Sequence, residues 1–238
     1  MALFGVFGDA ARLYVLLWRH SLPAAALAIG AVWAAEAALD QVEGLLAAIV
    51  GLTALLLALA APMLVQGMLI ELVEDVHEGR RATETLVVAR RTLNRVPSLV
   101  GASIIYFFGV AFGLVLLIVP GLIAAARWCL MPPLIVLENR DVGEARARSS
   151  GLVTGKTGRV LLIVIVLGAL EYGLPTAVYE RDIVYYGVTT LVTPYVAHVL
   201  SALYYRLTDP ERSVIAPRHG SLGSAWDEHA LEDARSRT

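Results

Sequence analysis

Six apolar segments, most of them long enough to cross a lipid bilayer, recur along this chain and are separated by charged gaps. A helix needs about 20 apolar residues to cross about 30 Å of hydrocarbon. The segments comprise residues 21–39, 44–70, 98–119, 121–137, 160–178 and 183–205. With 58% hydrophobic and only 17% charged residues, the composition lies outside the usual range of soluble domains. The sequence therefore predicts an all-α, polytopic integral membrane protein with six transmembrane helices.

The basic residues predict how the chain is oriented in the membrane. With a cytoplasmic N-terminus, Lys and Arg gather in the gaps on that side, mainly in residues 80–95 and 140–159. The connections on the other side are short and hold one basic residue, Arg181. This asymmetry follows the positive-inside rule, so we expect a plasma (inner) membrane protein with both termini cytoplasmic. A signal peptide over residues 1–38 is the weaker alternative, because five more apolar segments follow.

Three basic amphipathic stretches, residues 1–20, 80–96 and 140–158, each precede a pair of apolar segments, which indicates an internal repeat. We expect three amphipathic helices that lie along the membrane interface, where anionic lipid headgroups attract basic side chains. The arginines expected to meet these headgroups are Arg12, Arg19, Arg90, Arg91 and Arg95. Residues 208–238 lose the apolar periodicity, and we expect a disordered cytoplasmic tail.

Two charged residues, Arg127 and Glu171, fall inside the apolar segments. A charge in hydrocarbon costs several kcal/mol and usually finds a partner, and both residues lie about 10 Å from the outer surface. We expect the two to pair and neutralise each other. A substrate or proton site, or an Arg127 that reaches the interface alone, are the alternatives.

Prolines and glycines predict turns and close helix packing. Proline cannot continue a helix and glycine tolerates chain reversal, so we expect a hairpin turn at Pro120-Gly121. Pro132 and Pro133 predict a kink in the fourth apolar segment. Gly109 and Gly113 form a GxxxG pair, and we expect helices to approach closely there, within one chain or between two copies.

No residue pattern in the sequence supports an enzyme. The segment from Gly151 to Thr157 has one residue too few between its glycines for a phosphate-binding loop, and it leads into an apolar segment. We expect no catalytic residues, no cofactor, no metal and no nucleic-acid partner. A membrane-protein partner or a second copy of the chain is compatible with the pattern.

Residues 98–165 resemble a known family by motif. They contain the Pro120-Gly121 pair, Ala126-Arg127-Trp128, Pro132-Pro133, Glu138 and Arg148-Ser149-Ser150. This pattern is similar to the membrane domain attached to some glycerophosphodiester phosphodiesterases and to stand-alone six-helix membrane proteins of unknown function. The resemblance implies a helical membrane bundle and no phosphodiesterase activity, because the catalytic barrel of those enzymes is a separate domain.

Two functions follow as hypotheses. The first is a non-enzymatic membrane module that organises or assists membrane partners. The alternative is a transporter or channel for a small solute or lipid, which would require a polar cavity lined by Arg127 and Glu171.

Overall fold

The computed structural model describes residues 5–78, 85–178 and 182–209, and every regular element in these ranges is a helix. The helices are α1 (Gly5–Leu39), α2 (Gly44–His77), α3 (Thr85–Leu93), α4 (Val96–Leu116), α5 (Ile118–Trp128), α6 (Met131–Leu137), α7 (Val142–Val153), α8 (Thr157–Gly168), the π-helix η1 (Ala169–Gly173), α9 (Leu174–Ala177) and α10 (Asp182–Thr208). Six helical stretches are long and apolar enough to cross a membrane: Gly5–Leu39, Gly44–His77, Val96–Leu116, Ile118–Leu137, Thr157–Ala177 and Ile183–Thr208. The predicted all-α fold with six candidate spans is therefore confirmed at this level.

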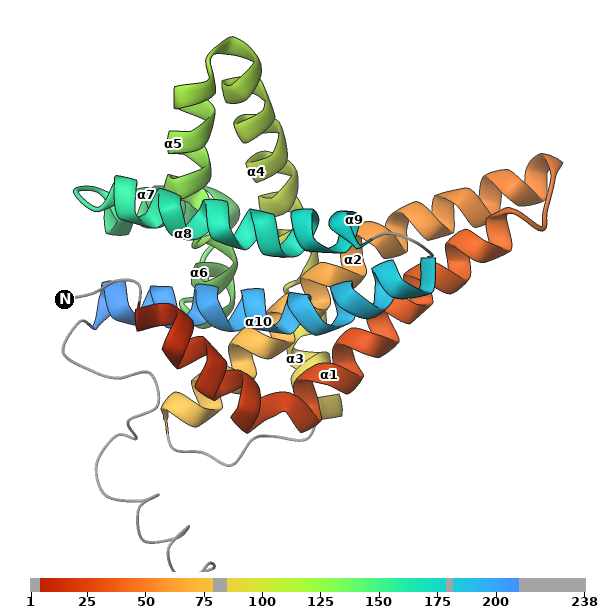
Figure 1. Cartoon of the computed structure of the whole chain (residues 1–238), viewed down its shortest axis with the longest axis horizontal. Coiled ribbons are helices and arrows are strands. Elements are labelled where there is room, and N and C mark those ends of the chain that lie inside the picture. The colour runs from red at the N-terminus through yellow and green to blue at the C-terminus, as the bar shows by residue number, and fades with distance from the viewer. Residues whose placement is uncertain (1–4, 79–84, 179–181, 210–238) are drawn as a thin grey trace, which may run out of the picture.

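The six candidate spans do not form one tight bundle. Figure 1 shows the α1–α2 hairpin and the α4–α5 hairpin projecting in different directions from a shared central region. In the most apolar 18-residue windows of α2 and α4, only 6% and 11% of the residues are buried within the chain. Large apolar side chains such as Leu45 and Phe112 are 79% and 70% exposed. The hairpins therefore present apolar surface to whatever surrounds them.

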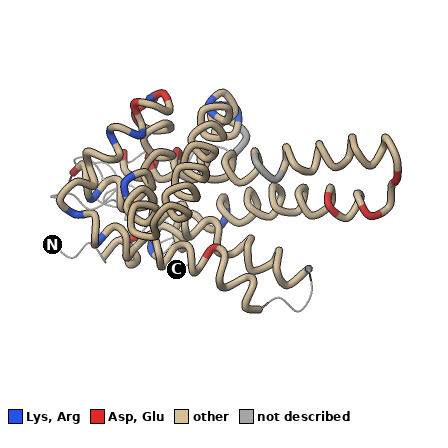
Figure 2. The backbone as a smooth tube through the Cα atoms, turned by 90° about the horizontal axis from the view of Figure 1, so that it is seen from above, with Lys and Arg blue, Asp and Glu red and all other residues tan. Residues whose placement is uncertain are grey.

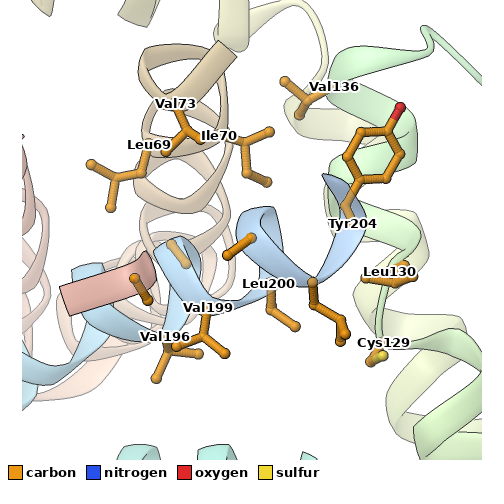
Figure 3. Packing of buried hydrophobic residues seen from close by; sticks show 14 of the residues in the cluster. Leu69, Ile70, Val73, Cys129, Leu130, Val136, Val196, Val199, Leu200 and Tyr204 are labelled. Atoms are coloured by element: carbon orange, nitrogen blue, oxygen red, sulfur yellow. The ribbon is translucent and has the colours of Figure 1, made fainter. Parts of the chain in front are cut away.

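The buried apolar side chains gather in a central region, the hub, whose members include Leu13, Leu69, Leu130, Ile135 and Leu203. Figure 3 shows Leu69 and Ile70 of α2, Val199 and Leu200 of α10 and Leu130 as members of this buried cluster. A fully buried Leu or Ile contributes about 1.5–3 kcal/mol through the hydrophobic effect. Packing of these buried side chains therefore holds the helices together at the hub.

The first amphipathic stretch is not a separate helix, so that prediction is wrong. Residues 1–20 and 21–39 were expected as an interfacial helix followed by a span, but α1 is continuous from Gly5 to Leu39. It bends along its length (Figure 1), as expected for a helix with an interior proline, Pro23, which removes one backbone hydrogen bond. Its residues Val6, Leu13 and Leu17 are buried in the hub, so the N-terminal part packs on protein.

The reversal between α4 and α5 lies three residues before the predicted turn. Leu117 alone is extended, with φ −159° and ψ 133°, whereas Pro120 and Gly121 lie inside the first turn of α5. The first backbone N–H groups of a helix have no intrahelical acceptor, so a proline in that turn sacrifices no hydrogen bond. The prediction of a turn at Pro120-Gly121 is therefore wrong in its position, although a hairpin does form.

The other boundaries differ from the predictions in smaller ways. The fourth span is interrupted between α5 and α6, and Pro132 and Pro133 lie in the first turn of α6, which begins at Met131. The second span continues to His77, and the fifth contains the π-helix η1. The expected disordered tail lies almost wholly outside the described residues, and α10 reaches Thr208.

Candidate functional site

The predicted pair of intramembrane charges does not form. Among the described residues, no ion pair joins Arg127 to Glu171, and Arg127 is exposed in the last turn of α5. The backbone of Arg127 lies against α7 at the hub, because its carbonyl accepts a hydrogen bond of 2.6 Å from Ser149. Glu171 lies 14 residues beyond the start of α8, or about 21 Å along the helix. Direct neutralisation was therefore a wrong prediction.

Glu171 lies within the π-helix η1 and is partly buried. Its electrostatic neighbours are tyrosines, namely Tyr106 of α4 and the adjacent Tyr172. A π-turn inserts one extra residue into a helix and changes the direction in which the following side chains point. Glu171 therefore lies within electrostatic range of two tyrosines and of no arginine in the described part of the chain.

The two glycines of the GxxxG pair both lie against α5. A Cβ atom at Gly109 would overlap the ring of Trp128, and one at Gly113 would lie 2.7 Å from the Cα atom of Gly121. Gly121 in turn leaves no room for a Cβ atom, which would lie 2.5 Å from the backbone nitrogen of Leu114. The close approach therefore occurs within one chain, at the α4–α5 hairpin.

A serine of α7 bridges the break between α5 and α6. The Ser149 hydroxyl donates to the Arg127 carbonyl and accepts a hydrogen bond of 3.3 Å from the backbone N–H of Leu130. Both backbone groups would otherwise lack partners where the helix is interrupted. The kink expected at Pro132-Pro133 thus lies just before those prolines and is held by a neighbouring helix.

Ionic contacts tie the helices together at the hub. Asp9 of α1, only 8% exposed, accepts hydrogen bonds of 2.7 and 2.9 Å from Arg206 of α10. Glu138, which follows α6, pairs with Arg140 at 2.5 Å, and Tyr204 of α10 donates a hydrogen bond of 3.2 Å to it. The guanidinium and carboxylate groups here therefore serve as links between helices.

A charged cleft lies where α2, α3 and the end of α6 meet. Its volume is about 450 Å³, and its lining residues are Glu71, Glu74, Arg91, Asn94, Arg95, Val136 and Asn139. Cavities of about 300–1,000 Å³ are the usual size of small-molecule sites. Neither Arg127 nor Glu171 lines this cleft, so the cavity expected for the transporter hypothesis does not coincide with it.

One guanidinium group of the cleft is fixed by the backbone of α6. Arg95 donates hydrogen bonds to the carbonyls of Ile135 and Val136, at 2.8 and 2.5 Å. The last carbonyls of a helix lack intrahelical donors, and a cation there also complements the helix dipole. Arg95 was expected to meet lipid headgroups together with Arg12, Arg19, Arg90 and Arg91, but its structural contacts are with α6.

Part of this cleft was visible in the sequence. Glu71 and Glu74 directly follow the long apolar run of α2, and the arginines were visible as a basic stretch. Their convergence with Asn139 depends on the packing of α3 and α6 against α2, which no local pattern encodes. No family model, no curated protein and no solved structure matches this chain.

Proposed function

We propose that this protein is a non-enzymatic membrane module that organises membrane partners through its projecting apolar hairpins. The observation that carries the proposal is the separation of a packed hub from hairpins that the rest of the chain leaves uncovered. A contiguous exposed apolar surface marks a lipid-facing or protein-binding face.

The charge distribution supports an orientation with the hub on the cytoplasmic side of the plasma membrane. Figure 2 shows Lys and Arg gathered around the hub, whereas the charged residues at the far end of the α1–α2 hairpin are all acidic. Those acidic residues are Glu36, Asp40 and Glu43. Arg12, Arg19 and Arg90 are exposed at the hub, where anionic headgroups would attract them.

Photocrosslinking in native membranes tests the proposed role. The photoreactive analogue p-benzoylphenylalanine replaces Phe107 or Phe112, which are 66% and 70% exposed on α4. Phe7 is the matched control, because it packs against the hub. We expect the same protein adduct, of one mass, from both α4 positions and none from Phe7. If both α4 positions yield lipid adducts alone, the partner-organising role is refuted.

Accessibility of Glu171 separates this proposal from transport. A cysteine at position 171, in a chain whose only native cysteine is replaced (Cys129→Ala), reports whether water reaches η1. We expect no reaction with a membrane-impermeant thiol reagent from either side. Rapid reaction from either side would indicate a water-filled pathway and favour the transporter or channel.

A further inference from the structure

The charged cleft lies where the apolar part of α2 ends. Residues 44–70 carry no charge, and Glu71 and Glu74 follow at once. The cleft that these residues line is therefore placed at the level where hydrocarbon gives way to headgroups. A lipid could occupy it with its headgroup while its chains remain beside the hairpins.

The cleft carries equal numbers of opposite charges. Glu71 and Glu74 come from α2, whereas Arg91 lies on α3 and Arg95 directly precedes α4. Glu71 is only 8% exposed and lies within electrostatic range of both arginines. A ligand with a single charge would be repelled by the cleft residues of the same sign. A ligand with both charges would be attracted by residues of both signs.

Three hydrogen-bond donors in the cleft are unused. Arg91, Asn94 and Asn139 are exposed, and none of them has a hydrogen bond or ion pair with the described part of the chain. Asn139 has a left-handed backbone, with φ 52°, a conformation that asparagine tolerates better than most residues. Guanidinium and amide N–H groups are among the donors from which phosphate oxygens accept hydrogen bonds.

We propose that the cleft binds the headgroup of a phospholipid that carries both a phosphate and an ammonium group. The phosphate accepts hydrogen bonds from Arg91, Asn94 and Asn139, and the ammonium group faces Glu71 on the α2 side of the cleft. Arg95 keeps its hydrogen bonds to the α6 carbonyls and so fixes the α6 side of the cleft. This inference goes beyond the proposed organising role, because it concerns the hub and needs no protein partner.

Binding of short-chain lipids to the full-length protein in detergent tests the proposal. The probes are dihexanoylphosphatidylethanolamine, dihexanoylphosphatidylglycerol, which lacks the ammonium group, and free phosphoethanolamine, which lacks the chains. Native mass spectrometry gives the relative affinities. We expect phosphatidylethanolamine to bind about tenfold more tightly than phosphatidylglycerol. This ratio corresponds to the loss of one ionic contact that contributes about 1.4 kcal/mol. Equal binding of these two lipids would overturn the proposal, and equal binding of free phosphoethanolamine would overturn its lipid source.

Neighbouring arginines supply matched variants. Arg91→Gln removes a donor of the cleft, whereas Arg90→Gln removes an adjacent charge that does not line it. We expect about tenfold weaker phosphatidylethanolamine binding for Arg91→Gln and unchanged binding for Arg90→Gln. Equal losses in the two variants would mean general attraction to basic residues and would refute the site.

A second pair of variants tests the acidic wall and guards against misfolding. Glu71→Gln should reduce the preference for phosphatidylethanolamine over phosphatidylglycerol, because the ammonium group loses a carboxylate. Asn94→Ala, at an exposed position on the cleft, should weaken both lipids about equally, since it contacts the shared phosphate. If Glu71→Gln does not fold, Asn94→Ala with unchanged affinity for both lipids would still overturn the assignment.

Discussion

The α4–α5 hairpin should be the part of this protein most sensitive to added volume. Gly113 and Gly121 bring two helix backbones together just before and after the reversal at Leu117. An alanine Cβ at Gly113 would lie 2.7 Å from the Cα atom and 2.9 Å from the nitrogen of Gly121. Both obstructing atoms belong to the backbone, so neither can move aside as a flexible side chain would.

The size of the effect follows from two opposing terms. Overpacking costs about 1–3 kcal/mol, whereas replacing glycine by alanine inside a helix gains about 0.5–1 kcal/mol. We therefore expect Gly113→Ala and Gly121→Ala to lower the free energy of unfolding by roughly 1–2 kcal/mol. Gly30→Ala is the matched control in α1, because a Cβ atom there meets nothing within 4 Å, and it should leave the stability unchanged or slightly raise it.

Unfolding of the purified protein by SDS titration in detergent micelles, followed by far-ultraviolet circular dichroism, measures these differences. The reasoning fails if Gly113→Ala and Gly121→Ala unfold at the same SDS concentration as Gly30→Ala. That result would mean that the hairpin opens without cost and that close packing does not hold it.

Other contacts give further expected outcomes. Ser149→Ala should lower the free energy of unfolding by about 1–3 kcal/mol, because it leaves two backbone groups at the helix break unpaired. Ser150→Ala is the control, and equal stability of the two variants would contradict the bridging role of Ser149. Asp9→Asn should cost roughly 1–3 kcal/mol through its contact with Arg206, and an unchanged thermal midpoint would argue against that link. Cys129, 7% exposed, should react with a maleimide only after unfolding, which mass spectrometry detects, and rapid labelling of the folded protein would show that the hub opens.

The positions of Arg127 and Glu171 show why the sequence pattern did not predict which charged residues meet. Arg127 and Glu171 lie at similar depths when residues are counted from their respective turns, which suggested a pair. That counting assumed a parallel bundle and a reversal at Pro120-Gly121, and the structure has neither. Depth along a helix says nothing about the direction in which that helix leaves the hub.

The sequence alone determined the helical class, the six candidate spans and the separation of charge, because each depends on the composition and periodicity of a continuous segment. A run of about 20 apolar residues satisfies its own backbone hydrogen bonds as a helix, whatever its neighbours are. The sequence also identified Gly109 and Gly113 as a point of close packing, since small residues at that spacing share one helix face.

Tertiary structure alone decided which side chains meet. The position of the α4–α5 reversal depends on one extended residue, Leu117, and the break after α5 depends on Ser149 of another helix. The cleft combines residues from α2, α3 and the end of α6 that lie up to 68 positions apart. Such contacts arise from packing between segments, where the energy differences among arrangements are small and are set by the shapes of many side chains together.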